Sequence, residues 1–90
     1  MTEAELIQQG EDADQVLKSE AFNRVVNKLV EQTFQNFVNS QPEQSKERSI
    51  TYYHYRALVD VVNTLKQQVA VRDEVLSKRD ISEEVETDYA

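Results

Sequence analysis

The sequence predicts an all-α protein built around an antiparallel helical hairpin. Apolar residues recur every three or four positions over residues 20–39 and again over 46–78, which is the spacing of one helix face. Pro42, the only proline, lies in a polar segment between these stretches, and a proline cannot continue a helix. A single glycine in ninety residues also argues against a turn-rich β fold.

Residues 1–18 are an acidic N-terminal segment that we expect to form a weaker helix. Thr2, followed three residues later by Glu5, has the form of a capping box. Gly10 is expected to interrupt this helix, because glycine is a poor helix former, and residues 10–14 are expected to form a loop. The segment has a thin apolar face, made of Leu6, Ile7, Ala13, Val16 and Leu17.

Residues 19–78 are predicted to form the hairpin. Ser19 is the expected N-cap of its first helix, and Glu20 follows where negative charge suits the helix dipole. The first helix is expected to end in the segment from Asn39 to Pro42. Of the two serines that could cap the second helix, Ser45 is favoured over Ser49.

The second helix of the hairpin carries two apolar series. One is interrupted by Arg72; it contains Tyr55, Leu58, Val62, Leu65, Val69 and Leu76. The other contains Ile50, Ala57, Val61, Val71 and Val75. Since one series serves the intramolecular partner, the second predicts a further contact and an oligomeric protein.

Helix lengths add a constraint on packing. At 1.5 Å per residue, the two helices span about 30 Å and about 50 Å, so the shorter one covers the longer only to about residue 65. The apolar residues beyond this point, among them Val69, Val75 and Leu76, need other cover. Either the N-terminal segment or a second copy of the chain could supply it.

Charge is concentrated at the two ends of the chain. Residues 1–20 have a net charge of −5, residues 80–90 also −5, and residues 21–79 a net charge of +3. Residues 79–90 are expected to be a flexible acidic tail, because they are charged and poor in apolar residues. The acidic ends either keep a helical core with exposed apolar surface in solution or bind to a basic surface of a partner.

A tyrosine-rich segment at residues 51–56 is the most distinctive local feature. Three tyrosines within little more than one helical turn cannot all face one way, so Tyr55 and one of Tyr52 or Tyr53 are expected to pack. The segment is either the packed mouth of the hairpin or an interface rich in Tyr and Arg. The candidate core or interface residues are Phe34, Phe37, Tyr53, Tyr55 and Val62.

Catalytic and cofactor chemistry are not expected. The chain has no cysteine and a single histidine, His54, so a zinc or haem site is not predicted. One glycine cannot build a phosphate-binding loop. The N-terminus lacks the apolar region of a secretory signal, and no apolar run approaches the ~20 residues that cross a bilayer. We therefore expect a cytoplasmic protein with no membrane association, no cofactor and no enzymatic activity.

From about Leu17 to Lys78, some two-thirds of the chain, the sequence resembles small phage-encoded helical proteins of head-morphogenesis and DNA-packaging genes. The resemblance rests on the helix opening at residues 17–22, the polar turn with Pro42, and Glu47-Arg48 before the tyrosine-rich helix. This group includes proteins like small terminase subunits and proteins like scaffolds or adaptors. Membership implies an assembly role in the host cytoplasm or the virion. The resemblance transfers no functional residue.

The expected function is therefore non-enzymatic protein–protein interaction or assembly, with a homo-oligomer and a protein partner. An alternative from another class is a small acidic inhibitor or DNA mimic that blocks a basic cleft on an enzyme. A third is nucleic-acid binding by the mildly basic hairpin, through stacking on tyrosines and contacts of Arg48, Arg56 and Lys46 with phosphates.

Overall fold

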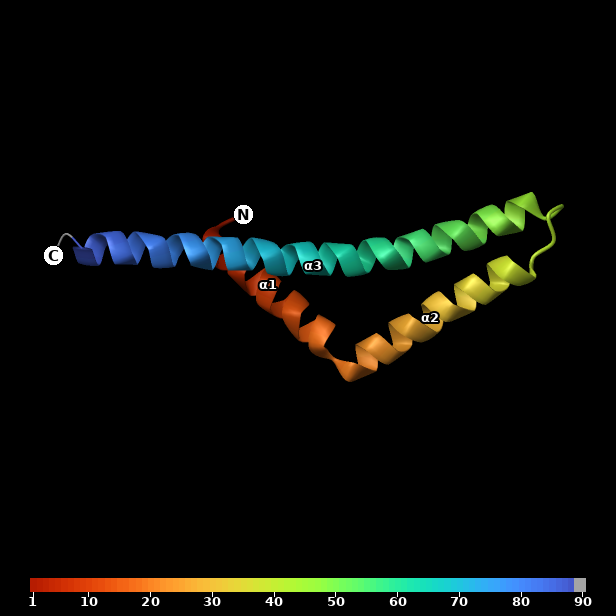
Figure 1. Ribbon diagram of the computed structural model, residues 1–90, viewed down its shortest axis with the longest axis horizontal. Helices are drawn as coiled ribbons and strands as arrows, with labels where there is room; N and C mark the ends of the chain where they lie inside the picture. The colour runs from red at the N-terminus through yellow and green to blue at the C-terminus, as the bar shows by residue number, and fades with distance from the viewer. Residues whose placement is uncertain (89–90) are drawn as a thin grey trace. The chain divides into compact units, whose positions relative to one another are not determined.

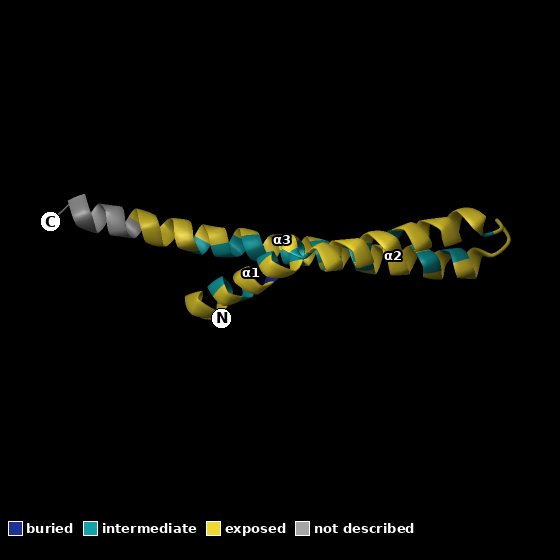
Figure 2. Ribbon diagram, turned by 90° about the horizontal axis from the view of Figure 1, so that it is seen from below, coloured by how far each residue is buried: buried dark blue, intermediate teal, exposed yellow. Residues whose placement is uncertain are grey.

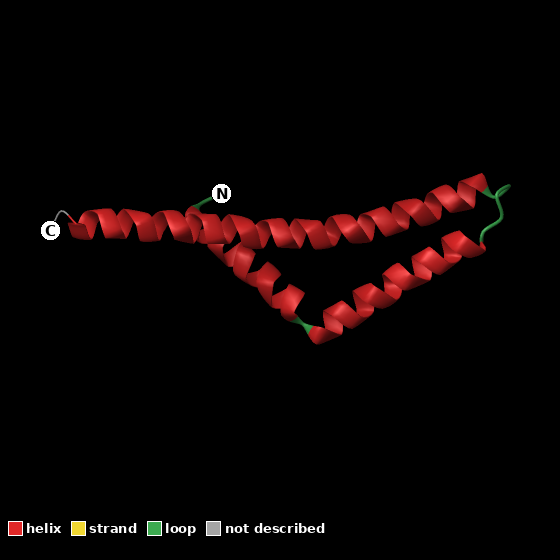
Figure 3. Cartoon of the chain, viewed as in Figure 1, coloured by secondary structure: helices red, strands yellow, loops and turns green. Residues whose placement is uncertain are grey.

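The computed structural model contains three helices: α1 (Glu3–Lys18), α2 (Glu20–Asn39) and α3 (Ser45–Asp88) (Figure 1). The structure describes the backbone of residues 1–88 and the side chains of residues 1–81. That part of the chain contains no strand. The prediction of an all-α protein is confirmed. Figure 3 shows the short non-helical connections, at Ser19 between α1 and α2 and at residues 40–44 between α2 and α3.

The helices belong to two compact units. Unit 1 comprises residues Met1–Leu17 and Thr64–Ala90, and unit 2 comprises Lys18–Asn63. The last helix thus contributes to both units, with its first part in unit 2 and its later part in unit 1. The N-terminal segment accordingly covers the far part of the last helix, which is one of the two arrangements that the helix lengths predict.

Helix α1 begins with the predicted cap. The Thr2 hydroxyl accepts a hydrogen bond from the Glu5 backbone N–H at 3.2 Å, and the Thr2 carbonyl accepts one from the Leu6 N–H at 3.0 Å. These bonds satisfy backbone donors that a helix start otherwise leaves without partners.

The predicted interruption of α1 at Gly10 and the loop at residues 10–14 are wrong. The helix runs unbroken through this region, and Gly10 and Ala13 are buried. A Cβ atom placed on Gly10 would lie 2.3 Å from Arg72 Cβ and 2.8 Å from the Gln68 backbone oxygen of α3. Glycine therefore occupies this position because the backbones of α1 and α3 approach closely, a use of glycine that outweighs its poor helix propensity.

An ion pair lies beside this contact in unit 1. Arg72 Nη1 donates to Asp14 Oδ2 at 3.2 Å, and the two side chains are only 17% and 24% exposed. Arg72 also donates to its neighbour Asp73. Hydrogen bonds to Asp73 and then to Asp14 raise the pKa of Arg72 above its ordinary value, so it stays protonated at every practical pH. A second pair, Arg79 Nε to Glu3 Oε2 at 3.1 Å, joins the same two helices.

Helix α2 has the predicted bounds and the predicted cap. The Ser19 hydroxyl accepts a hydrogen bond from the Phe22 backbone N–H at 3.2 Å, while the Ser19 backbone is extended. At the other end, both the backbone N–H and the hydroxyl of Ser40 donate to the Phe37 carbonyl. Ser40 therefore closes α2 with its own side chain.

Substituting Ser19 with alanine is expected to lower the free energy of unfolding by about 1 kcal/mol, because the Phe22 N–H loses its acceptor. Urea titration followed by circular dichroism measures the change. Ser19→Asp keeps an acceptor at the cap and serves as the matched control. Equal losses in both variants would contradict the capping role.

The connection from α2 to α3 is a tight turn at residues 41–44. The Gln44 N–H donates to the Gln41 carbonyl at 2.9 Å, and the Gln44 side chain accepts from the Gln41 N–H at 2.7 Å. Gln44 precedes the helix, and its carbonyl accepts from the Arg48 N–H at 2.9 Å. Ser45, the predicted N-cap, is instead the first helical residue. The Gln44 side chain closes the turn before the helix, while its backbone carbonyl accepts the first hydrogen bond of α3.

Helix α3 continues ten residues beyond the predicted end at Lys78, to Asp88. Neither glycine nor proline follows Lys78, so no residue type there forces the helix to stop. The predicted flexible tail at residues 79–90 falls mainly on residues 82–90, which lie outside the described side chains. Over the described residues, none of the helices combines the length and hydropathy that crossing a bilayer requires.

Burial is sparse over residues 1–81. Ala13, at 2% exposure, is the one buried hydrophobic side chain, and Figure 2 shows most of the described ribbon as exposed. Around it in unit 1, several apolar residues are half-buried: Leu6, Ile7, Leu17, Leu65, Val69, Val71 and Val75. In unit 2 no described residue is buried.

Candidate protein-interaction surface

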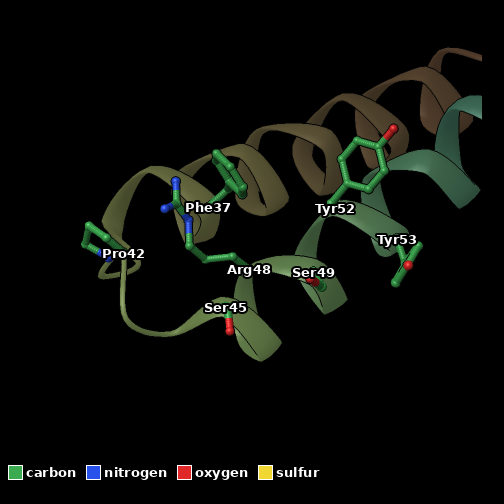
Figure 4. A pocket seen from close by; sticks show the side chains of 7 residues that line it. All are labelled: Phe37, Pro42, Ser45, Arg48, Ser49, Tyr52 and Tyr53. Atoms are coloured by element: carbon green, nitrogen blue, oxygen red, sulfur yellow. The ribbon is translucent and has the colours of Figure 1, made fainter.

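Two neighbouring hollows lie on unit 2, where α2 and the start of α3 meet. The first, of about 310 Å³, we call the aromatic groove. It is lined by Thr33, Phe34, Phe37, Thr51, Tyr52 and Tyr55. The second, of about 380 Å³, we call the Arg48 hollow. It is lined by Phe37, Pro42, Ser45, Arg48, Ser49, Tyr52 and Tyr53 (Figure 4).

The aromatic groove has the same residue pattern on both of its walls. On α2, Thr33 is followed one and four positions later by Phe34 and Phe37. On α3, Thr51 is followed at the same spacing by Tyr52 and Tyr55. Positions separated by three or four residues share a helix face, so each helix presents two aromatic rings to one side. The groove is therefore built from two equivalent short segments.

The threonine hydroxyls of the groove are satisfied within their own helices. Thr33 Oγ1 donates to the Val30 carbonyl at 2.8 Å, and Thr51 Oγ1 donates to the Glu47 carbonyl at 3.0 Å. Because these donors already have acceptors, an apolar surface that covers them leaves neither threonine hydroxyl proton without a partner. The groove is suited to an apolar occupant.

The Arg48 hollow combines a cation with aromatic walls. The Arg48 guanidinium carbon lies 4.5 Å from the centroid of the Phe37 ring, and Figure 4 shows the side chain directed toward Phe37 and Pro42. Arg48 Nε is buried and has no hydrogen-bond partner among the described atoms. Stacking on the ring supplies the cation with an electrostatic contact in place of that bond.

The tyrosines of this region have different surroundings. Tyr52 lines both hollows, whereas Tyr53 lines the Arg48 hollow alone. Their ring centroids are 6.0 Å apart with an interplanar angle of 61°, an edge-to-face arrangement that aromatic pairs favour. Tyr52 is 52% exposed and Tyr53 67% exposed, so neither ring is enclosed by unit 2.

Four of the five candidate residues lie at the hollows. Phe34, Phe37 and Tyr55 line the aromatic groove, and Tyr53 lines the Arg48 hollow. Val62 is half-buried and lines neither.

Sequence reasoning left Tyr52 as an alternative to Tyr53 and missed Thr33 and Thr51 as groove residues. The repeated threonine–aromatic spacing is the signal that could have identified them. Arg48 was considered only as a phosphate contact.

The described residues contain no group of three or more His, Cys, Asp or Glu side chains that could hold a metal ion. The side chains at the hollows offer apolar surface, hydroxyls and one guanidinium, which is suited to binding a protein surface. No protein-family model matches the chain, and neither a curated protein nor a solved structure matches it.

Proposed function

We propose that this chain is a non-enzymatic protein–protein interaction and assembly protein. Unit 2 acts as an antiparallel helical hairpin that forms a homo-oligomer and binds a protein partner through the aromatic groove. The observation that carries the proposal is the exposure of the aromatic residues there: Phe34 is 59% exposed, Tyr52 52% and Tyr55 41%. Tyrosine and arginine at one surface are typical of interface hot spots.

The exposed aromatic area is large for so small a chain. At about 200 Å² per aromatic side chain, Phe34, Phe37 and the three tyrosines leave on the order of 500 Å² in contact with water. The largest apolar patch on a typical monomer is about 300–600 Å², and such patches are often functional. Each partner of a standard interface buries about 800 Å², so the aromatic residues alone account for most of that area.

The resemblance of residues 17–78 to phage-encoded helical proteins extends the proposal to a biological setting. In that setting the chain acts in head morphogenesis or DNA packaging, as a scaffold or adaptor, in the host cytoplasm or the virion. An apolar docking surface without a catalytic constellation is what a scaffold or adaptor requires.

The alternative function, an acidic inhibitor or DNA mimic, needs rows of carboxylates that are free to meet a basic partner. In unit 1, Asp14 binds Arg72, Glu3 binds Arg79, and Asp12 accepts a hydrogen bond from Gln8. Part of the acidity of unit 1 is therefore engaged in contacts within the chain. This observation favours assembly over mimicry.

An NMR dilution series on uniformly ¹⁵N-labelled full-length chain tests the proposal. Amide signals of Phe34, Phe37, Tyr52 and Tyr55 are expected to shift or broaden with concentration, because these residues enter and leave a contact. Signals of exposed α1 residues such as Gln8 serve as the internal reference. Groove signals that do not change with concentration, and do not respond to any added protein, would contradict a role in assembly.

A further inference from the structure

We propose that the aromatic groove of unit 2 packs against the same groove of a second copy, and that the acidic charge of unit 1 opposes this pairing. Added salt is then expected to strengthen the association between two copies instead of weakening it. The inference rests on the proposed function and deepens it, because it names the occupant of the groove and the force that limits its binding.

The charge of the chain is divided unequally between the two units. Unit 2 has six basic and five acidic residues, a net charge of +1, whereas unit 1 has four basic and twelve acidic residues, a net charge of −8. In unit 2, Glu20 pairs with Arg24 and Asp60 with Arg56, so part of its charge is balanced locally. Two copies of unit 2 can meet without a charge penalty, and two copies of unit 1 repel each other.

The groove is suited to a twofold contact with itself. A twofold interface uses the same patch on both copies, so the patch must complement itself. The groove has equivalent walls on α2 and α3, each with a threonine and two aromatic rings, and edge-to-face aromatic pairs need no opposite charges. With Tyr53 of the adjoining Arg48 hollow included, the exposed aromatic surface of two copies comes to about 1,000 Å² in total, which is near the lower limit for a specific interface.

The competing arrangement is head to tail, with the acidic unit 1 of one copy on unit 2 of the next. That contact is driven by attraction between opposite charges, which salt screens over a Debye length of about 30 Å at 0.01 M and about 3 Å at 1 M. Groove-to-groove pairing is apolar at the contact and repulsive elsewhere, so screening removes only the repulsion. The sign of the salt dependence therefore separates the two arrangements.

The first experiment is sedimentation equilibrium of the full chain at low and at high sodium chloride. We expect the association constant to rise on the order of tenfold between about 0.01 and 0.5 M salt. The variant Glu5→Gln/Glu11→Gln/Asp80→Asn removes three exposed charges from unit 1, and it is expected to associate more tightly at low salt and to respond less to added salt. The charge-preserving control is Glu5→Asp/Glu11→Asp/Asp80→Glu, which should behave as the wild type.

The second experiment uses the absence of native cysteine. Thr51→Cys places a thiol at the groove, and Gln15→Cys places one at an exposed position of α1. With a short thiol-specific cross-linker, two copies of the Thr51→Cys variant are expected to be cross-linked to each other. When the two variants are mixed, no cross-link between Thr51→Cys and Gln15→Cys chains is expected.

Association that weakens with salt, or mixed cross-links in place of groove-to-groove links, would overturn the inference and leave the assembly function standing. A chain that remains a 10.5 kDa monomer at every salt concentration would overturn the homo-oligomer of the proposed function as well.

Discussion

Replacing Gly10 with alanine is expected to lower the free energy of unfolding of unit 1 by about 1–3 kcal/mol. The added methyl group would lie 2.3 Å from Arg72 Cβ and 2.8 Å from the Gln68 carbonyl oxygen. Neither atom is the end of a flexible side chain, so α1 and α3 must move apart locally. At a solvent-facing helix position the same substitution stabilises by about 0.5–1 kcal/mol, which is the opposite sign.

Urea unfolding followed by circular dichroism measures the total change, and amide hydrogen exchange localises it to α1. Gln15→Ala is the matched control, because Gln15 is exposed on the same helix and its replacement should change stability by less than about 0.5 kcal/mol. A more stable Gly10→Ala protein would show that α1 does not approach α3 this closely.

The double substitution Phe34→Ser/Tyr55→Ser is expected to weaken self-association by about a hundredfold or more, since loss of an aromatic hot spot costs about 2 kcal/mol or more. The two residues lie on opposite walls of the aromatic groove, one on α2 and one on α3. Because both side chains are exposed, at 59% and 41%, their loss removes only part of the contacts within the single chain. The variant should therefore keep its helix content and no longer associate with a second copy of the chain.

Val25→Ser is the matched control for this experiment. Val25 is 57% exposed, a fraction similar to the 59% of Phe34. It lies nine residues before Phe34 on α2, and at 3.6 residues per turn this places it on the opposite face of the helix. Sedimentation velocity compares the two variants with the wild type. Equal weakening by Val25→Ser would place the contact elsewhere on α2, and unchanged association of the double variant would exclude the groove.

Helix type and most helix boundaries could be predicted, because they depend on local signals. The Ser19 cap, the end of α2 before Pro42 and the Thr2 cap each follow from one residue and its immediate neighbours. The start of α3 differs by one residue from the predicted start, because the Gln44 carbonyl, and not that of Ser45, accepts the first hydrogen bond of the helix. The extension of α3 past Lys78 was missed because a polar composition is not in itself a helix stop.

The contact between α1 and α3 could be predicted only in outline. Helix lengths indicated that either the N-terminal segment or a second copy of the chain covers the far part of α3, and the structure places α1 there. Gly10 was interpreted as a helix breaker, and Arg72 as a polar interruption of an apolar series. The structure explains both together, since a glycine allows close approach at Arg72 and Asp14 then pairs with that arginine. Such a contact joins two nearby residues of α1 to an arginine 58 positions beyond Asp14, and no local pattern specifies it.

The candidate surface was predicted by residue type more than by position. Aromatic content favoured Phe34, Phe37 and Tyr53, whereas the heptad-like series contained both Tyr55, which lines the groove, and Val62, which lies outside both hollows. Which tyrosine lines the groove depends on the rotation of α3 relative to α2. The turn at residues 41–44 joins the two helices, and its hydrogen bonds involve a side chain that the sequence pattern did not single out.

We propose that copies of the chain associate through the aromatic groove. Light scattering after size exclusion, over a tenfold concentration range, gives the absolute mass of the wild type beside the Phe34→Ser/Tyr55→Ser variant. We expect the wild type to have the mass of a dimer or larger closed assembly, and the variant to have a mass near the 10.5 kDa of one chain. A wild-type protein with the mass of one chain at every concentration would contradict it.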